Sequence, residues 1–476
     1  MKELHFDRRF VALSAVLLLL AVGGSVALGF GAMIRNALIA LAIATFVLAP
    51  LPRGTRGLVF AVMIGLATGI ASVNLFAVQI FQAPVTSEFG WSQTQYTVVI
   101  LVGTVITVVS SPLIGWVFDK HGVRPFAIGS TFLFGLALVS LYWLTPSLLH
   151  FYGVFALIPL IGAGTSSVAY ARVVARWFDA RRGQALGAAL AGIGIGGAVL
   201  SALTQGLIQN VGWRGAYLGL GLLLLLVTLP LLLAFLHDSP EEVGLGVDGE
   251  VIGTTHARVV STPYGYSMAE VFRLGRFWAM VAAFMLLAIA IGGVMLQLVP
   301  IMLARGVSAS QAAAFPAVLG LALIIGRAFA GFLMDRYFAP YVAAIILLFP
   351  VVGVALLASG AVGSSAFVGA AFLGLAAGAE LDVIAYLVAR YFGTVSYARI
   401  YGFLYAAWTL GSGTAPVVTS RVFDATGSHT VILWVYVGLF ALSAIMIARL
   451  GPYPLLLSQM RPAPLAERRD PDPADV

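Results

Sequence analysis

The chain contains no cysteine, and only 9% of its 476 residues are charged. Without cysteine no disulfide can form, and cysteine usage gives no information on the redox compartment. A soluble domain carries about 25% charged residues, so most of this chain has no aqueous surface to cover. Hydrophobic residues make up 61% of the sequence instead. They form recurrent runs of about 20 residues, each long enough to cross a bilayer of ~30 Å as a helix.

Lipid offers no hydrogen-bond partner to the backbone, so a spanning chain must form helices or a closed barrel. Barrel strands alternate in polarity over about 10 residues, whereas the runs here are longer and continuous. We therefore expect an all-α polytopic membrane protein. The expected spans are residues 10–33, 36–51, 58–83, 95–118, 125–145, 149–175, 184–208, 215–236, 276–302, 311–334, 341–359, 362–389, 399–420 and 430–450.

Residues that would support other functions are also scarce. No pair of histidines has the spacing of metal ligands, and there is no Walker loop for ATP. We expect no enzyme activity, no metal and no cofactor. The net charge of +7 is distributed over short loops without a basic tract, so we expect no nucleic-acid partner. No obligate protein partner is indicated.

The sequence contains an internal repeat. The segment that ends at Gln95 matches the segment that ends at Gln311, and the Gly115 region matches the Gly331 region at the same offset of 216 residues. Two homologous six-span halves, 58–236 and 276–450, follow from this repeat. Residues 237–275 are a polar linker, in which Ser267 and Glu270 fit the capping box of a surface helix. The matched residues are Pro84, Gly90, Ser92, Gln95, Gly115 and Asp119 with Pro300, Gly306, Ser308, Gln311, Gly331 and Asp335.

Both ends of the chain lie outside the repeat. Residues 1–57 hold two extra apolar runs, which we interpret as an N-terminal hairpin of two helices. Residues 451–476 are rich in proline and charge, and we expect a disordered tail. Basic residues cluster in alternate loops, so the positive-inside rule places the linker and both termini in the cytoplasm. We expect a bacterial-type inner (plasma) membrane protein.

The stretch "GWVFDKHGVRP" at 115–125 is a tight turn on that inner face. Gly115 lets a neighbouring helix approach, and Gly122 suits the turn itself. Asp119 is expected to accept hydrogen bonds from the turn or from a helix N-terminus. Arg124 is expected to reach a carboxylate or a lipid phosphate, and Arg172 to extend to the surface by snorkelling.

This glycine–aspartate–basic pattern between a second and a third span resembles the loop motif of the major facilitator superfamily. The duplicated six-span halves and the long central linker resemble that superfamily as well, over about 58–450. The resemblance implies two six-helix bundles (12 core helices) and a loop that stabilises one conformer by holding helix ends together. The second copy keeps Gly331, Asp335 and Arg336 but has Phe338 in place of a second glycine. The implied loop residues are Gly115, Asp119, Lys120, Gly122, Arg124, Asp335 and Arg336.

Two further stretches resemble the monocarboxylate and oxalate–formate transporters. They are "FGWSQTQ" at 89–95 and "RWFDARRGQALGAALAGIGIGG" at 176–197. The acidic stretch that the monocarboxylate family has before its first span is absent, since "LPRGTRG" stands there. The fifth span lacks the proline that proton-coupled drug antiporters usually carry in its glycine stretch, which counts against multidrug efflux without excluding it.

Charged groups at membrane depth are costly and therefore indicate function. Arg327 lies eight residues before Asp335, or roughly 12 Å inside the boundary. Its planar guanidinium matches a carboxylate bidentately, and monocarboxylate-type transporters have a substrate-binding arginine at the matching place. The alternative is a structural ion pair with an internal acid.

Glu380 and Asp382 are the acids at depth, with Glu380 about 15 Å inside. Residues that are two positions apart point in directions ~200° apart around a helix axis, so the two carboxyls cannot both face one cavity directly. A carboxyl in a low-dielectric site can exchange protons near neutral pH. One of the two is a candidate for the coupled proton; the alternative is charge compensation for Arg327 or Arg172.

Polar side chains on other spans are weaker candidates. Asn74, Gln79 and Gln82 follow the first core span, and tyrosines and a glutamine elsewhere can donate hydrogen bonds. With Arg327, the substrate-binding set that we predict is Asn74, Gln79, Gln297, Tyr386 and Tyr405; Tyr170 and Tyr401 are further possibilities.

The sequence therefore predicts a secondary transporter that moves a small organic anion, of the monocarboxylate class, by proton-coupled alternating access between two bundles. Its partners would be the anion, protons and the lipid bilayer. The alternative within transport is efflux of hydrophobic or multidrug compounds. The alternative outside transport is a non-transporting, receptor-like membrane protein.

Overall fold

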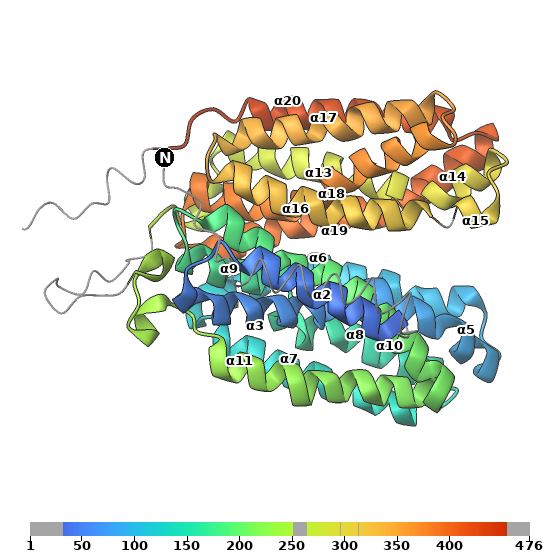
Figure 1. Cartoon of the computed structure of the whole chain (residues 1–476), viewed down its shortest axis with the longest axis horizontal. Helices are drawn as coiled ribbons and strands as arrows, with labels where there is room; N and C mark the ends of the chain where they lie inside the picture. Colours follow the sequence, from blue (N-terminus) through green and yellow to red (C-terminus); the bar gives the residue numbers. More distant parts are fainter. Residues whose placement is uncertain (1–31, 251–263, 296, 313, 455–476) are drawn as a thin grey trace, which may run out of the picture.

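The computed structural model describes residues 32–250, 264–295, 297–312 and 314–454. Helices run roughly parallel to the long axis of the molecule in two groups, one drawn above the other in Figure 1. The expected all-α architecture is confirmed for the described residues. In the described part, eight segments are long and apolar enough to cross a membrane, and two shorter apolar helices accompany them.

The first bundle follows the first half of the repeat. Its sixth span continues from the fifth in one long helix, α10, which bends at Gly212 (φ 73°, ψ 171°) where two helices had been expected. The segments are η1 Arg53–Thr55, α3 Arg56–Ala67, α4 Ile70–Ser72, the π-helix η2 Val73–Ala77, α5 Val78–Phe89, α6 Gln93–His121, α7 Arg124–Ser140, η3 Leu141–Trp143, α8 Leu148–Ile161, η4 Ala163–Thr165, α9 Ser167–Trp177, α10 Arg182–Leu223, the π-helix η5 Leu224–Thr228 and α11 Leu229–Phe235.

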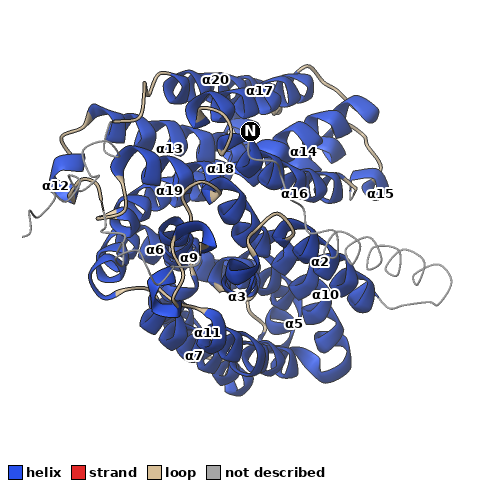
Figure 2. Cartoon of the chain, turned by 60° about the vertical axis from the view of Figure 1, so that its left-hand side comes forward, coloured by secondary structure: helices blue, strands red, loops and turns tan. Residues whose placement is uncertain are grey.

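The second bundle and the linker complete the fold, as the turned view in Figure 2 also shows. The linker includes the predicted surface helix α12, whose capping box of Ser267 and Glu270 is present. The segments are η6 Pro240–Val243, η7 Val247–Gly249 and α12 Met268–Val271 in the linker, then α13 Gly275–Met295, α14 Leu298–Ala304, α15 Ala309–Ala312, α16 Phe315–Met334, α17 Ala339–Ala358, α18 Ser364–Phe392, α19 Tyr397–Thr426 and α20 Thr430–Ala448.

Part of the N-terminal extension is visible. The second predicted helix of the hairpin corresponds to α2, Ala32–Leu48, which packs against α10 and α3. The first predicted helix, 10–33, lies almost wholly outside the described residues, as does the predicted tail from residue 455 onward.

Two spans of the first bundle are broken at the same depth. In the first core span, Gly69 is extended between α3 and α4 (φ −71°, ψ 176°). In the fourth, α8 contains Pro159 and ends at Ile161, and Ser166 is extended before α9. The breaks touch, because the Ile70 amide donates to the Thr165 hydroxyl at 3.1 Å. Non-helical backbone at membrane depth requires such internal partners or a cavity.

The bundles meet closely at one end, which we call the linker end because residues 237–250 lie there; the opposite end is the far end. Here α6 packs against α19, and α10 packs against α16. A Cβ on Gly115 would meet the Ala398 carbonyl, and a Cβ on Gly183 would meet the Gly331 carbonyl. Glycine at these crossings lets the two backbones approach, as the sequence predicted for Gly115.

A pair of carboxylates ties the bundles together at the linker end. Asp119, at the end of α6, accepts from the amides of Ala398 (3.0 Å) and Arg399 (2.9 Å), where α19 begins. Asp335, just after α16, accepts from the amides of Gly183 (2.7 Å) and Gln184 (2.9 Å), where α10 begins. Each carboxylate caps a helix of the opposite bundle, where free amides and the helix dipole favour an anion.

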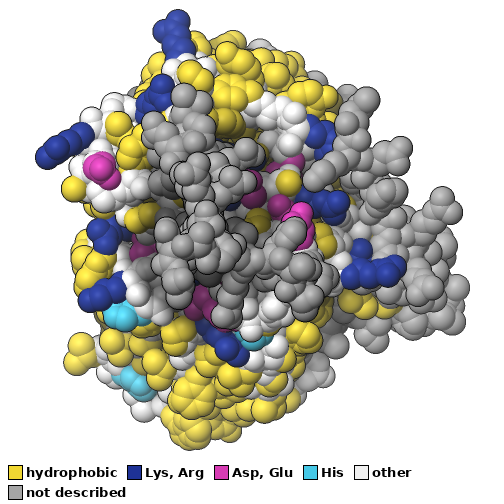
Figure 3. Space-filling model, turned by 90° about the vertical axis from the view of Figure 1, so that its left-hand side faces the viewer, with side chains coloured by type: hydrophobic (Ala, Val, Ile, Leu, Met, Phe, Trp, Pro, Cys, Tyr) yellow, Lys and Arg dark blue, Asp and Glu magenta, His cyan; other side chains and the backbone are white. Residues whose placement is uncertain are grey.

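The basic residues of the two repeat turns lie at the rim of this end. Gly122 has φ 84°, as a tight turn requires. Lys120 lies over the ring of Trp116, and Arg336 lies over the ring of Phe332. Figure 3 shows the linker end face-on, with Lys and Arg side chains around its edge and acidic side chains nearer its centre.

Two basic residues at this end have partners that the sequence did not predict. Arg124 donates to the carbonyl of Leu233 at 3.2 Å. Arg172 does not extend to the surface; its Nε lies 3.0 Å from Asp119 Oδ1, and both side chains are buried. The carboxylate that caps α19 keeps Arg172 inside, because a buried anion needs a cation nearby.

The glycine crossing gives a first prediction. Replacing Gly183 by leucine should prevent closure of the linker end, because its Cβ would meet backbone atoms of Gly331 that cannot move aside. A clash of this kind costs ~1–3 kcal/mol. We expect about a tenfold rise in maleimide labelling of a single cysteine placed at Ala398, a fully buried position.

Gly206 on the same helix serves as the control, because a Cβ there meets nothing within 4 Å. Gly206→Leu should leave the labelling unchanged. Equal labelling of the Gly183→Leu and Gly206→Leu proteins would contradict the assignment of the crossing.

Closure should also depend on pH through Asp335. Burial raises the pKa of its carboxyl to about 7. Hydrogen bonds from two backbone amides and the positive charges of Arg390 and Arg182 oppose this rise without cancelling it. In the opened, hydrated end the pKa returns toward ~3.9. Closing the linker end therefore takes up a proton. The closed state is most stable below about pH 4, and it loses this stabilisation as the pH rises through 7.

The measurement is labelling of the Ala398→Cys reporter at pH 5.5 and pH 8, normalised to the unfolded protein. Labelling should be greater at pH 8 in the parent, and Asp335→Asn, which keeps one acceptor oxygen, should flatten the pH dependence. Asp335→Ala should raise labelling roughly tenfold at both pH values, since a lost helix cap costs ~1 kcal/mol or more. An unchanged pH profile in Asp335→Asn would be inconsistent with this role.

Candidate functional site

Arg327 and Asp382 form an ion pair inside the second bundle. Arg327 is on α16 and Asp382 on α18, and the Arg327 Nε lies 3.4 Å from Asp382 Oδ2. Both side chains are almost completely buried, at 4% and 0% exposed. An ion pair at this depth has lost most of its hydration, so each charge depends on the other.

The same guanidinium also bonds to two backbone carbonyls. Its Nε donates to Gly378 O on α18 at 2.9 Å, and its Nη1 donates to Leu190 O on α10. The second bond crosses from one bundle to the other. Rearrangement of the bundles at this level must therefore change the surroundings of Arg327.

Glu380 does not form an ion pair with Arg327, although it lies near enough to both Arg327 and Asp382 to interact with their charges. It lines a separate cavity of about 10 Å³ between helices of the second bundle, among apolar side chains such as Phe284, Ala343 and Ile447. Such a volume admits about one water. Its Oε2 has no hydrogen-bond partner among the described residues. The two acids therefore face different surroundings, as their spacing predicted.

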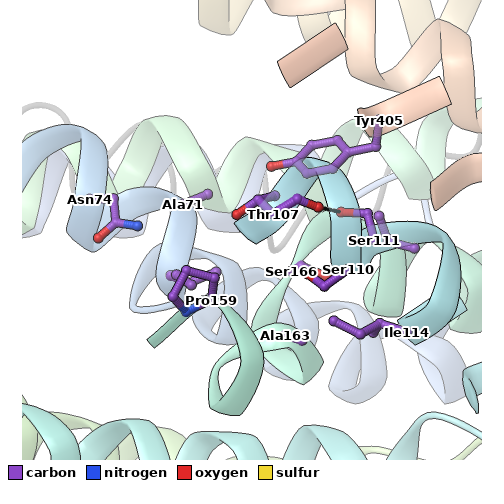
Figure 4. A pocket seen from close by; sticks show the side chains of 12 residues that line it. Ala71, Asn74, Thr107, Ser110, Ser111, Ile114, Pro159, Ala163, Ser166 and Tyr405 are labelled. Atoms are coloured by element: carbon purple, nitrogen blue, oxygen red, sulfur yellow. Dashed lines mark hydrogen bonds between the residues drawn. The ribbon is translucent and has the colours of Figure 1, made fainter. Parts of the chain in front are cut away.

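A larger cavity of about 80 Å³ lies at the broken helices of the first bundle (Figure 4). It is bordered on one side by Tyr405 of α19, so both bundles contribute to its wall. Among the described residues, no charged side chain lines it. The polar groups around it are Asn74, Thr107, Ser110, Ser111, Ser166 and Tyr405.

The hydroxyl groups of this cavity differ in their hydrogen bonds. Thr107 and Ser111 donate within their own helix, to Gly103 O and Thr107 O. The Ser110 Oγ is buried without a hydrogen-bond partner among the described residues. The Ser166 hydroxyl does not cap α9, although it stands at the N-cap position. The Ser110 hydroxyl therefore retains hydrogen-bonding capacity that a polar ligand could use.

Two tyrosines of α19 connect the cavity with the ion pair. The ring centroids of Tyr401 and Tyr405 are 6.4 Å apart. Tyr401 also lies near the charges of Arg327 and Asp382 and near the Ser167 hydroxyl. The charged pair and the polar cavity are therefore parts of one region between the bundles.

The predicted substrate residues fall into two sets. Asn74 and Tyr405 line the cavity. Gln79 lies exposed on α5, and Gln297 stands at the N-cap of α14. Tyr386 lies at the linker end, where its hydroxyl donates to Met334 O and accepts from Arg390, so it is remote from the cavity in this conformer.

Four hydroxyl-bearing residues of the cavity were not predicted from the sequence, namely Thr107, Ser110, Ser111 and Ser166. Small hydroxyls inside an apolar run are common, because they bond to the preceding turn of their own helix. The pair Ser110–Ser111 directly before Pro112 was the available signal. Only the two adjacent helix breaks make these residues line a common space.

Comparisons with known proteins agree with the architecture. A family model described as the Major Facilitator Superfamily matches residues 62–379. Human Monocarboxylate transporter 12 is 24% identical over 383 residues, which cover 75% of this chain and 72% of that protein.

Solved structures share the fold. The proton:xylose symporter XylE aligns with a TM-score of 0.67 at 17% identity, over 84% of this chain and 96% of that one. The human organic anion transporter MFSD10 aligns with a TM-score of 0.60 at 16% identity, over 83% of this chain and all of that one. With two bundles, a buried ion pair and these relatives, the chain belongs to the Major Facilitator Superfamily, as a membrane transporter of its monocarboxylate-transporter-like branch.

Proposed function

We propose that the protein carries a small monocarboxylate together with a proton by alternating access. The observation that carries the proposal is the buried Arg327–Asp382 pair with its bond to Leu190 of the opposite bundle. The similarity to Monocarboxylate transporter 12 and to an organic anion transporter supports an anionic substrate. The polar cavity at the broken helices is the proposed chamber for the uncharged part of the substrate.

Charge balance explains how the pair would couple the two fluxes. With Asp382 ionised, Arg327 is neutralised and the empty site has no net charge. When a proton binds Asp382 and the substrate carboxylate takes its place on Arg327, the net charge is again zero. Binding of the proton alone or of the anion alone leaves one charge uncompensated in a low-dielectric site, which is strongly unfavourable. Only the empty and the doubly occupied sites then permit the bundles to rearrange.

We place the proton on Asp382 and not on Glu380. Asp382 contacts the guanidinium that the substrate would use, whereas Glu380 lies in an apolar cavity within one bundle. Among the predicted substrate residues, Asn74 and Tyr405 fit the chamber. Gln79, Gln297 and Tyr386 would need a different conformer to reach it.

We infer further that the linker end is cytoplasmic, from the concentration of basic residues in its loops. Closed at this end, the protein has the arrangement of an outward-facing conformer. The carboxylates Asp119 and Asp335 then hold that conformer until the loaded substrate site favours rearrangement.

The first test is flux into proteoliposomes from a panel of short monocarboxylates, with and without a pH gradient. We expect uptake of at least one acid and accumulation when the outside is acidic. Absence of flux for every carboxylate would overturn the proposal. Flux of lipophilic compounds in its place would favour the efflux alternative.

Arg327→Lys is the substitution that tests the carboxylate site. Lysine keeps the charge but loses the planar fork, so it cannot hold a carboxylate by two parallel hydrogen bonds. We expect a loss of roughly a hundredfold or more in carboxylate flux. Arg305→Lys is the control, because Arg305 bonds only to carbonyls of Leu357 and Ala361 at the far end among the described contacts. Full transport by Arg327→Lys would refute the assignment.

Asp382→Asn tests proton coupling. Asparagine imitates the protonated acid, so we expect exchange of labelled for unlabelled substrate to continue while accumulation driven by a pH gradient disappears. Glu380→Gln should retain accumulation. The opposite outcome, with Glu380→Gln uncoupled and Asp382→Asn coupled, would move the proton site to Glu380.

A further inference from the structure

Residues 237–250 of the linker, which we call the clasp, are attached to the first bundle at several points. Asp238 accepts from the amides of Val123 (2.7 Å) and Arg124 (3.1 Å), where α7 begins. The indole of Trp177 donates to the carbonyl of His237 at 3.0 Å. The clasp therefore has its own fixed structure and does more than connect the bundles.

Asp248 makes the most elaborate of these attachments. Its carboxylate accepts from three consecutive amides of the turn between α9 and α10: Asp179 (3.3 Å), Ala180 (2.9 Å) and Arg181 (3.2 Å). Successive amides that converge on one anion form a strong, directional site. A single side chain of the linker thus determines the conformation of this turn.

The backbone at Asp248 is adapted to this contact. Its φ of 58° and ψ of 16° are left-handed, and it is the one non-glycine residue with positive φ in the described part of the chain. Aspartate tolerates this region better than most residues. The adjacent Gly249 packs so closely on Thr55 and Pro52 that a Cβ would collide with them. The clasp is thereby held against the start of the first core span.

The turn that Asp248 holds is also a contact between the bundles. Arg390 of α18 reaches across to it, with Nη1 3.5 Å from Asp179 Oδ1 and Nη2 3.4 Å from Asp179 O. Asp335 of the second bundle caps the next amides along the chain, at Gly183 and Gln184. Residues 179–184 therefore receive one carboxylate from the linker and two groups from the second bundle.

We propose that the clasp sets the stability of the closed linker end, and that Asp248 is the positioning residue through which it acts. By fixing the amides of 179–181, Asp248 holds the side chain and carbonyl of Asp179 where Arg390 meets them. Loss of the carboxylate would release the turn, weaken the Arg390 contact and shift the equilibrium toward an open linker end. The role concerns the conformational equilibrium and does not depend on which substrate is carried.

The test uses the natural absence of cysteine. A single cysteine at Ala398, on the other crossing of the linker end, reports opening by its maleimide labelling rate. We expect Asp248→Ala and Asp248→Gly to raise the rate about tenfold, which corresponds to ~1.4 kcal/mol. Alanine is strained at the positive φ of residue 248, whereas glycine is not. An effect that appears in both variants is therefore due to loss of the carboxylate and not to backbone strain. Asp248→Asn keeps one acceptor oxygen and should be intermediate.

Glu250→Gln is the matched control, because it removes the same charge from an exposed position two residues away. It should label like the parent. Equal opening by Glu250→Gln, or unchanged labelling in folded Asp248→Ala and Asp248→Gly, would overturn the proposal. If neither variant yields folded protein, Asp248→Asn decides: parental labelling contradicts the proposal, and a partial rise supports it.

A double-mutant cycle with Arg390→Ala tests the route of action. If Asp248 acts through the Arg390 contact, Asp248→Ala should add little to the labelling of the Arg390→Ala protein. Multiplication of the two separate effects would show that Asp248 acts independently of Arg390, and the positioning role would be wrong.

Discussion

A charge inside a lipid-embedded bundle must be neutralised, and the region between the two bundles is organised by that constraint. Arg327 is neutralised by Asp382 within one bundle, while its remaining bonds reach a carbonyl of that bundle and one of the other. Opening the interface at this level removes the Leu190 contact. The energetic state of one guanidinium is therefore coupled to the relative position of the bundles.

At the linker end, buried carboxylates are balanced by helix N-termini, and Asp119 is balanced by Arg172 as well. Asp119 and Asp335 occupy equivalent positions in the repeat, and each caps a helix of the opposite bundle. The internal duplication of the sequence is thus visible as a reciprocal contact. Asp248 adds a third carboxylate that belongs to neither half, and it stabilises the turn on which the Asp335 contact depends.

Much of this arrangement could be predicted from the sequence. Composition and run length gave the helical membrane fold, and the repeat gave the two halves, because both depend on properties that persist along the chain. Asp119 was expected to cap a helix, and the ~200° between Glu380 and Asp382 correctly separated their surroundings. These predictions rest on local geometry or on a constant offset.

The sequence did not reveal which distant residues would meet. The partner of Arg172 is 53 positions away, and the cavity forms only because two broken helices lie next to each other. Nothing in the sequence distinguishes Asp248 from other linker residues, because its three backbone partners belong to a turn almost 70 positions earlier in the chain. Tyr386 shares a helix face with Asp382 and Arg390, yet its hydroxyl is used at the linker end. Tertiary contacts of this kind leave no periodic pattern.

The central claim is that only uncharged states of the Arg327–Asp382 site rearrange. Its most direct test is substrate flux in proteoliposomes whose membrane potential is clamped by potassium and valinomycin, with no pH gradient. The account predicts an electroneutral flux whose rate and direction are unaffected by the potential. A flux that reverses with the sign of the potential would mean that net charge crosses with the substrate, and it would contradict the account.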